Sequence, residues 1–161
     1  MDTLSLLEAL AGSLSRQSRV FARSGLSSGC DLGAQIYALA QVAEKELARD
    51  IVKGAVGPDS AAEVAAALHR AGGDDAVELM SNLSAGDLVF PGHAYRDRGH
   101  ARRAAERAAG LLGYDVTWWT NIEGSWRDGR SWNPVTRFTF DGVVAGVGEE
   151  YFVILLQVGE D

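Results

Sequence analysis

All four tryptophans of the chain lie between positions 118 and 132, and no other feature of the sequence is better suited to binding. Trp118 and Trp119 are adjacent in a predicted strand, so their side chains should point to opposite faces of it. The other two lie in the polar segment 124–134 together with arginines, and Trp and Arg are enriched at the hot spots of protein interfaces. The predicted binding residues are Trp118, Trp119, Asn121, Glu123, Trp126, Arg127, Arg130 and Trp132.

The tryptophan cluster allows two other interpretations. An indole face can stack on a sugar, a base or another flat ligand. Alternatively, the tryptophans of the segment 124–134, which we expect to be a loop too long for a simple hairpin, fold back onto their own sheet and leave no binding surface. The sequence leaves both open.

Catalytic and metal-binding motifs are weak. The segment Gly25-Leu26-Ser27-Ser28-Gly29 has the letters of a nucleophile elbow, but no buried strand precedes it and no βα units follow, so we expect a flexible loop. Cys30 is the only cysteine, which excludes an intramolecular disulfide and a thiolate zinc site. His69, His93 and His100 do not supply three converging ligands. We therefore predict no catalytic residue, no metal and no cofactor, and favour a protein that is not an enzyme.

A run of basic residues precedes position 108. Its members, Arg96, Arg98, Arg102, Arg103 and Arg107, should form one flank of a helix. That flank could bind phosphate groups or dock on an acidic partner, or it could be a solvated face balanced by the acidic C-terminal strands. The formal net charge of −7 opposes binding to nucleic acid, so a nucleic-acid-binding regulator is the least favoured function.

The elements that position these residues change character near residue 113. Residues 2–112 are predicted to be mainly helical, and residues 114–158 to form an antiparallel β-meander, which gives an α+β chain with a single domain over 1–161. Helices are expected over 3–23, over 32–51 after the cap Asp31, and after the capping box that begins at Ser60. A short helix should span 75–83, and a last helix 97–112, with Gly113 as its stop.

The predicted strands are Tyr114–Ile122, Val135–Phe140, Val143–Val147 and Tyr151–Val158. Between the second and third, Asp141-Gly142 is the residue pair typical of a type I′ hairpin turn. The last strand is apolar on both faces, as expected of a central strand. We expect the helices to cover one side of this sheet.

Length and composition fit a folded chain of 161 residues and 17.1 kDa. The start, Met1 to Glu8, has an acidic residue where a secretory signal carries Lys or Arg, and no apolar run approaches the ~20 residues of a membrane helix, so we expect a cytoplasmic protein without a membrane partner. Arginine supplies 13 of the 15 basic residues, which is typical of a GC-rich bacterial genome.

In its build, an acidic α+β chain with an aromatic loop and no catalytic motif, the protein resembles bacterial immunity proteins, which neutralise a cognate toxin. The resemblance is one of type and transfers no functional residue. It implies a small acidic intracellular protein-binding module whose partner is a basic toxin domain, because complementary charge speeds association. The alternative is a small-molecule-binding domain or small enzyme with a pocket between helices and sheet, using Trp119, Asn121, Glu123 or His100. The oligomeric state is not predicted.

Overall fold

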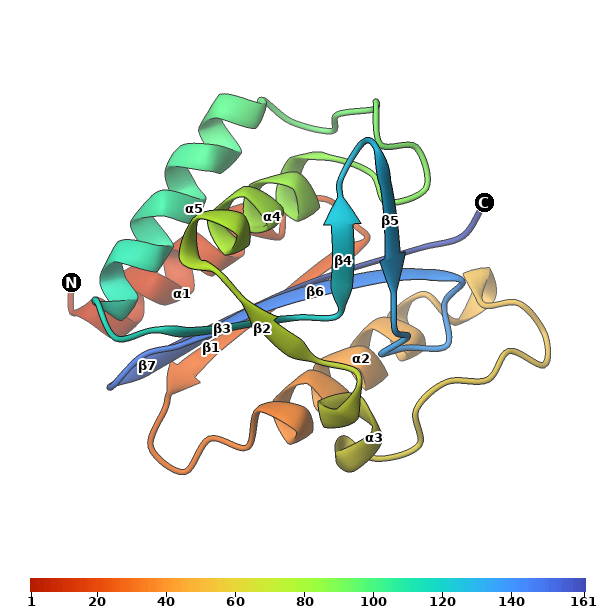
Figure 1. Cartoon of the computed structure of the whole chain (residues 1–161), viewed down its shortest axis with the longest axis horizontal. Helices are drawn as coiled ribbons and strands as arrows, with labels where there is room; N and C mark the ends of the chain where they lie inside the picture. Colours follow the sequence, from red (N-terminus) through yellow and green to blue (C-terminus); the bar gives the residue numbers. More distant parts are fainter.

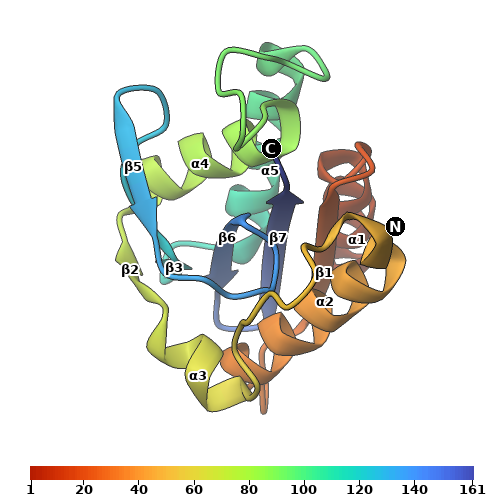
Figure 2. The ribbon, with the colours of Figure 1, turned by 90° about the vertical axis from the view of Figure 1, so that its right-hand side faces the viewer.

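A five-stranded antiparallel sheet with helices on both faces forms the centre of the computed structural model, which describes residues 1–161 (Figures 1 and 2). The strands lie in the order β1-β7-β6-β3-β2. The helices are α1 (Thr3–Leu14), α2 (Leu32–Glu46), η1 (Ala48–Asp50), α3 (Ala61–Ala66), α4 (Gly73–Ala85) and α5 (Arg98–Leu112). The strands of this sheet are β1 (Val20–Leu26), β2 (His69–Ala71), β3 (Thr117–Thr120), β6 (Phe140–Val147) and β7 (Tyr151–Gly159).

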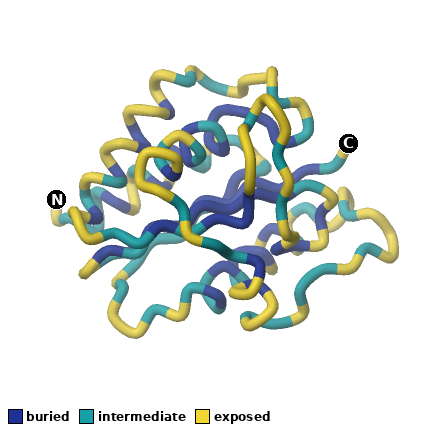
Figure 3. The backbone as a smooth tube through the Cα atoms, viewed as in Figure 1, coloured by how far each residue is buried: buried dark blue, intermediate teal, exposed yellow.

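The predicted α+β class with a C-terminal antiparallel sheet is confirmed, but helices cover both sides of the sheet rather than one. Alternate residues of β7 enter two separate cores: Leu155 packs with α1, α4 and α5, whereas Leu156 packs with α2 and α3. This is why β7 is apolar on both faces. Figure 3 shows the buried strands at the centre and exposed residues around them. No helix is long and apolar enough to cross a membrane.

The predicted helix ends are confirmed where a side chain caps them. The carboxylate of Asp31 accepts from the Ala34 N–H at 3.1 Å, and that of Asp97 from the His100 N–H at 2.8 Å. The Ser60 hydroxyl accepts from the N–H of Glu63 at 3.1 Å. Gly113, with φ of 95°, ends α5 in a conformation that favours glycine.

The predicted helix over 3–23 is wrong in its second half. Helix α1 ends at Leu14, and β1 then pairs with β7 at one edge of the sheet, with Phe21 opposite Leu156. The apolar residues Val20 and Phe21 are buried in different cores on the two faces of the sheet, which a strand allows and a helix stripe does not. Helix α2 also ends earlier than predicted, at Glu46, and η1 follows.

The Asp141-Gly142 turn is also wrong, because both residues lie inside β6. A Cβ at Gly142 would lie 2.6 Å from Ile122 Cδ1, so the glycine allows close packing inside the strand rather than a turn. The predicted strand Val135–Phe140 is an ordered segment without strand pairing, and only Phe140 belongs to a strand. The predicted loop 124–134 instead contributes to a two-stranded hairpin, formed by β4 (Ile122–Ser125) and β5 (Gly129–Trp132).

Candidate binding groove

The β4–β5 hairpin follows β3 directly and rises beside α4 (Figures 1 and 2). Trp126, at its tip, packs against Gly86 just after α4, where a Cβ would lie 3.0 Å from Trp126 Cζ2. The Arg130 guanidinium lies 4.9 Å from the centre of the Trp126 ring, and its Nη1 donates to the Trp126 carbonyl at 2.7 Å. Burial lowers the pKa of Arg130, and the nearby Asp87 carboxylate partly offsets this. The tip is thus fastened to the end of α4.

The base of the hairpin is held by the second tryptophan. Trp132 stacks on Phe140 with 5.4 Å between ring centres. Both tryptophans of the hairpin are therefore half-buried against their own protein. Their packing fixes the hairpin, and the ring of Trp126 also lines the groove described next.

A groove of about 840 Å³ lies between this hairpin, β2 and the first turns of α4. Only four of the 17 residues that line it are hydrophobic. Four of the others are carboxylates, Asp75 and Glu78 from α4 and Glu123 and Asp128 from the hairpin. The groove is therefore polar, with carboxylates on two opposing walls.

The groove carboxylates make no ion pair within 4.0 Å. The four ion pairs of the protein all lie elsewhere: Arg19–Asp50, Arg102–Glu106, Arg137–Glu44 and Arg137–Asp59. Three arginines, Arg70, Arg98 and Arg127, also line the groove, together with His69. Of these, Arg70 lies 5.4 Å over the ring of Trp119, and Arg98 donates to Asn82 Oδ1 at 3.3 Å and to two backbone carbonyls. Arg70 and Arg98 thus have other partners, and Arg127 is an exposed residue of the groove.

The structure places only some of the predicted binding residues at the groove. Glu123, Trp126 and Arg127 line the groove. Arg130 does not line it but packs against the ring of Trp126. Trp118 and Asn121 are buried, and Trp119 points to the opposite face of the sheet from Trp118. Only part of the predicted set therefore shares one surface.

Sequence reasoning missed the residues that β2 and α4 bring to the groove. These are His69, Arg70, Asp75, Glu78 and Asn82. They approach the hairpin because β2 pairs with β3, with Arg70 opposite Trp119. The only local signal was the acidic pair Asp74-Asp75 at the start of α4, which is equally explained by its favourable interaction with the helix dipole.

A buried polar network lies immediately behind the groove. The carboxylate of Asp141 accepts from the side chain of Asn121 at 2.8 Å, from the backbone N–H groups of Val135 and Thr136, and from the Thr136 hydroxyl. Burial raises the pKa of Asp141 to about 6, although these hydrogen bonds act in the opposite direction. Asn121 Oδ1 in turn accepts from the N–H of Val143 at 2.8 Å. This network fixes the segment between the hairpin and β6.

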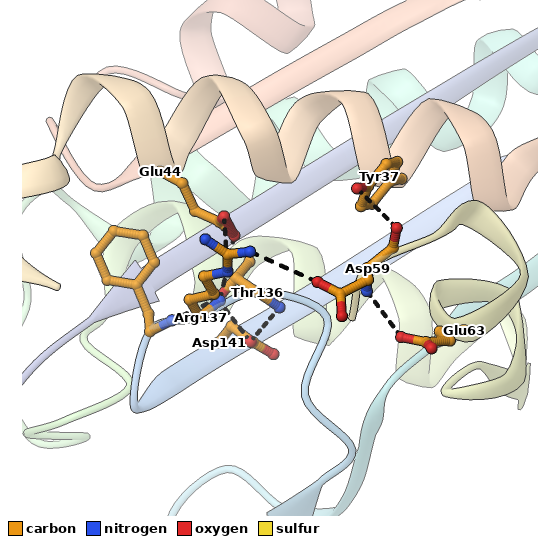
Figure 4. A network of polar contacts seen from close by, with 8 residues as sticks. Tyr37, Glu44, Asp59, Glu63, Thr136, Arg137 and Asp141 are labelled. Carbon is orange, nitrogen blue, oxygen red and sulfur yellow. Dashed lines mark hydrogen bonds and ion pairs between the residues drawn. The ribbon is translucent and has the colours of Figure 1, made fainter. Parts of the chain in front are cut away.

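The same segment is held on its outer side by Arg137. Figure 4 shows Arg137 between Glu44 of α2 and Asp59, with Nη2 of Arg137 3.5 Å from Oδ1 of Asp59. The backbone of Asp59 is itself held, since its carbonyl accepts from the Tyr37 hydroxyl at 3.0 Å and its N–H donates to Glu63 at 2.7 Å. Every acidic side chain in this network has a partner.

The arginine run 96–107 begins just before α5 and continues along it, and only part of it is free of contacts within the protein. Arg96 donates to the Ser13 carbonyl and to Ser84 Oγ, and burial lowers its pKa. Arg98 is engaged as described, and Arg102 pairs with Glu106 at 2.8 Å. Three of the five arginines thus make hydrogen bonds or an ion pair within the protein.

The residues named for a catalytic pocket do not line one cavity. His100 lies on α5 and Asn121 is buried, and of the named set only Glu123 borders the groove. The hydroxyl of Ser27, the serine of the elbow-like motif, donates to the Glu149 carbonyl at 2.8 Å. No group of three or more His, Cys, Asp or Glu residues is arranged to hold a metal ion.

Comparison with models of known families, with curated proteins and with solved structures finds no match to this chain.

Proposed function

We propose that this protein is a protein-binding module whose groove receives basic side chains of a partner, in the manner of an immunity protein that neutralises a basic toxin. The observation that carries the proposal is the set of four groove carboxylates, Asp75, Glu78, Glu123 and Asp128, which face a preformed groove without an ion pair of their own. A lysine or arginine of a partner would supply the missing counter-charge.

The lining favours a protein partner over a small molecule. Small-molecule sites of this volume are lined mainly by apolar and aromatic side chains. Here only four of 17 lining residues are hydrophobic, so little of the binding free energy can come from apolar burial. Charge-rich surfaces are typical of protein pairs that associate rapidly under complementary electrostatic fields.

The fixed hairpin supports the same conclusion. A flexible wall would lose conformational entropy on binding, at about 0.5–1.5 kcal/mol for each immobilised side chain. Trp126 on Gly86 and Trp132 on Phe140 hold both ends of the hairpin before any partner arrives. The net charge of −7 adds a long-range attraction toward a basic partner.

The test compares two variants of equal charge. The groove variant is Asp75→Asn, Glu78→Gln, Glu123→Gln and Asp128→Asn. The control is Glu8→Gln, Glu46→Gln, Glu149→Gln and Glu150→Gln, four exposed acids away from the groove. Each is tagged and used, beside the wild type, to capture proteins from a lysate of the source organism, and the captured partner is then purified for kinetic measurement.

We expect one stoichiometric basic partner with the wild type and the control, and at least tenfold weaker binding with the groove variant, mainly through slower association that converges at high salt. Equal affinity of the two variants would overturn the proposal, as would the absence of any stoichiometric partner. Alanine at Trp126 and Trp132 is a poorer test, because both rings hold the hairpin in place.

A further inference from the structure

The outer edge of β1 is the second surface with unmet bonding capacity. The Val158 N–H donates to the Arg19 carbonyl at 3.0 Å, and the Ser27 N–H to the Glu150 carbonyl at 2.8 Å. Hydrogen-bonded pairs alternate along an antiparallel ladder, so the odd-numbered residues of β1 exchange bonds with β7. The even-numbered residues therefore direct their backbone N–H and C=O groups away from the sheet.

Three of these outward residues, Ala22, Ser24 and Leu26, have no backbone hydrogen-bond partner in the chain, which leaves three N–H and three C=O groups open. The exposure of the outward residues rises along the strand, from buried Val20 to Leu26, whose side chain is 60% exposed. The open part of the edge thus includes an apolar side chain.

This edge lacks the features that normally prevent strand addition. Proline, lysine and β-bulges are the usual protections, and β1 has no proline or lysine and keeps an unbroken register with β7. Its one charged residue, Arg23, is turned toward α2, where Nη1 donates to Gln35 Oε1 at 3.3 Å. The opposite edge strand, β2, is only three residues long and includes the charged Arg70.

We propose that the partner of this edge is a second copy of the chain, paired through β1 in antiparallel fashion about a two-fold axis at Ser24. In this register Ala22 pairs with Leu26 of the partner subunit and Ser24 with Ser24 of the partner subunit. Each hydrogen-bonded pair exchanges two bonds, so six new bonds satisfy all twelve open groups of the two copies.

The side chains fit this register. Leu26 comes to lie opposite Ala22 of the partner subunit, which covers the exposed leucine with an apolar neighbour. Arg23 lies opposite Gly25 of the partner subunit, so the two copies of Arg23 do not face each other. A register centred one residue earlier would place Arg23 opposite Arg23 of the partner subunit, so that two like charges would face each other.

The dimer joins two five-stranded sheets into one continuous sheet. Because β1 and β2 are at opposite edges, the grooves beside β2 lie at the far ends and stay accessible. The pairing is thus compatible with the proposed function and does not depend on it.

The first experiment measures oligomeric state by sedimentation velocity over a concentration series. The wild type should shift from monomer to dimer as concentration rises. Ser24→Pro removes an outward N–H without breaking a bond to β7, so the variant should fold and remain monomeric. Ser24→Ala keeps the N–H and should dimerise like the wild type, and Leu26→Glu should be monomeric if the proline variant fails to fold.

The second experiment tests the register. With Cys30→Ser as background, Ser24→Cys places two thiols at the two-fold axis, where Cα atoms of a hydrogen-bonded pair are about 5.5 Å apart, within the range of a disulfide. Mild oxidation should give a covalent dimer for Ser24→Cys and little for Ala22→Cys, which faces Leu26 of the partner subunit. A wild type that stays monomeric at all concentrations, or a dimer that persists in Ser24→Pro and does not cross-link at position 24, would overturn the inference.

Discussion

Two sets of acidic residues differ in whether they are bonded within the protein: one comprises Asp141 and Glu44, and the other the four groove carboxylates. Asp141 is buried beside Asn121, and its carboxylate accepts hydrogen bonds from the Asn121 side chain and from the N–H and hydroxyl groups of Thr136. Two residues after Asn121, Glu123 belongs to the groove, where the carboxylates make no ion pair. The first set is bonded within the fold, whereas the second has no ion pair and is the set to which we assign partner binding in the proposed function.

Removal of the buried carboxylate should give the largest effect. Asp141→Ala leaves the N–H groups of Val135 and Thr136 without an acceptor and removes one of the two acceptors of the Asn121 amide, so the free energy of unfolding should fall by about 3–5 kcal/mol. Urea unfolding followed by tryptophan fluorescence measures this. A loss under 1 kcal/mol would mean that Asp141 does not hold the segment between the hairpin and β6.

The pH dependence of stability should be the next largest effect. The pKa of Asp141 is raised from 3.8 to about 6, so the unfolded chain releases this proton at lower pH than the folded chain. Between pH ~4 and ~6 the unfolded state therefore binds fewer protons, and stability should fall as pH rises, by about 3 kcal/mol in total. Unfolding curves across this window, compared with Asp141→Asn, isolate the contribution. An identical slope in the two proteins would contradict it.

The groove acids should give the smallest effect on stability. Glu78→Gln with Glu123→Gln should change the free energy of unfolding by no more than about 0.5 kcal/mol, since neither carboxylate makes an ion pair. Glu44→Gln is the matched comparison: glutamine can still accept from the N–H of Arg137 but loses the ion pair with the Arg137 guanidinium, which should cost about 1 kcal/mol. If the double variant proved more damaging than Glu44→Gln, the contrast between the two sets would fail.

The parts of the fold that could be predicted from the sequence depend on residues near one another in the chain. The caps Asp31, Ser60 and Asp97 act on N–H groups three residues away, so their short-range patterns are sufficient. The strand content after residue 113 follows from β-branched and aromatic residues. Local rules describe these elements well.

The predictions are wrong where contacts between residues far apart in the sequence determine the local structure. The segment after Leu14 continues a helical pattern but becomes β1 because β7, far along the chain, offers a ladder. Asp141-Gly142 has the letters of a turn, yet Gly142 lies inside β6, where a Cβ would come within 2.6 Å of Ile122 Cδ1 and 3.1 Å of Leu83 Cδ2. The groove escaped prediction for the same reason, since β2, α4 and the hairpin meet only through the β2–β3 pairing.

The position of β7 also has a consequence for how the chain folds during synthesis. It is the last strand to be made, yet it lies between β1 and β6. Ser27 and Glu149, whose hydrogen bond closes this pairing, are 122 residues apart, which at roughly 5–20 residues per second is a wait of about 6–24 seconds. Until β7 emerges, both edges of β1 are open, and a chain stalled before residue 151 should be a substrate for chaperones or aggregation.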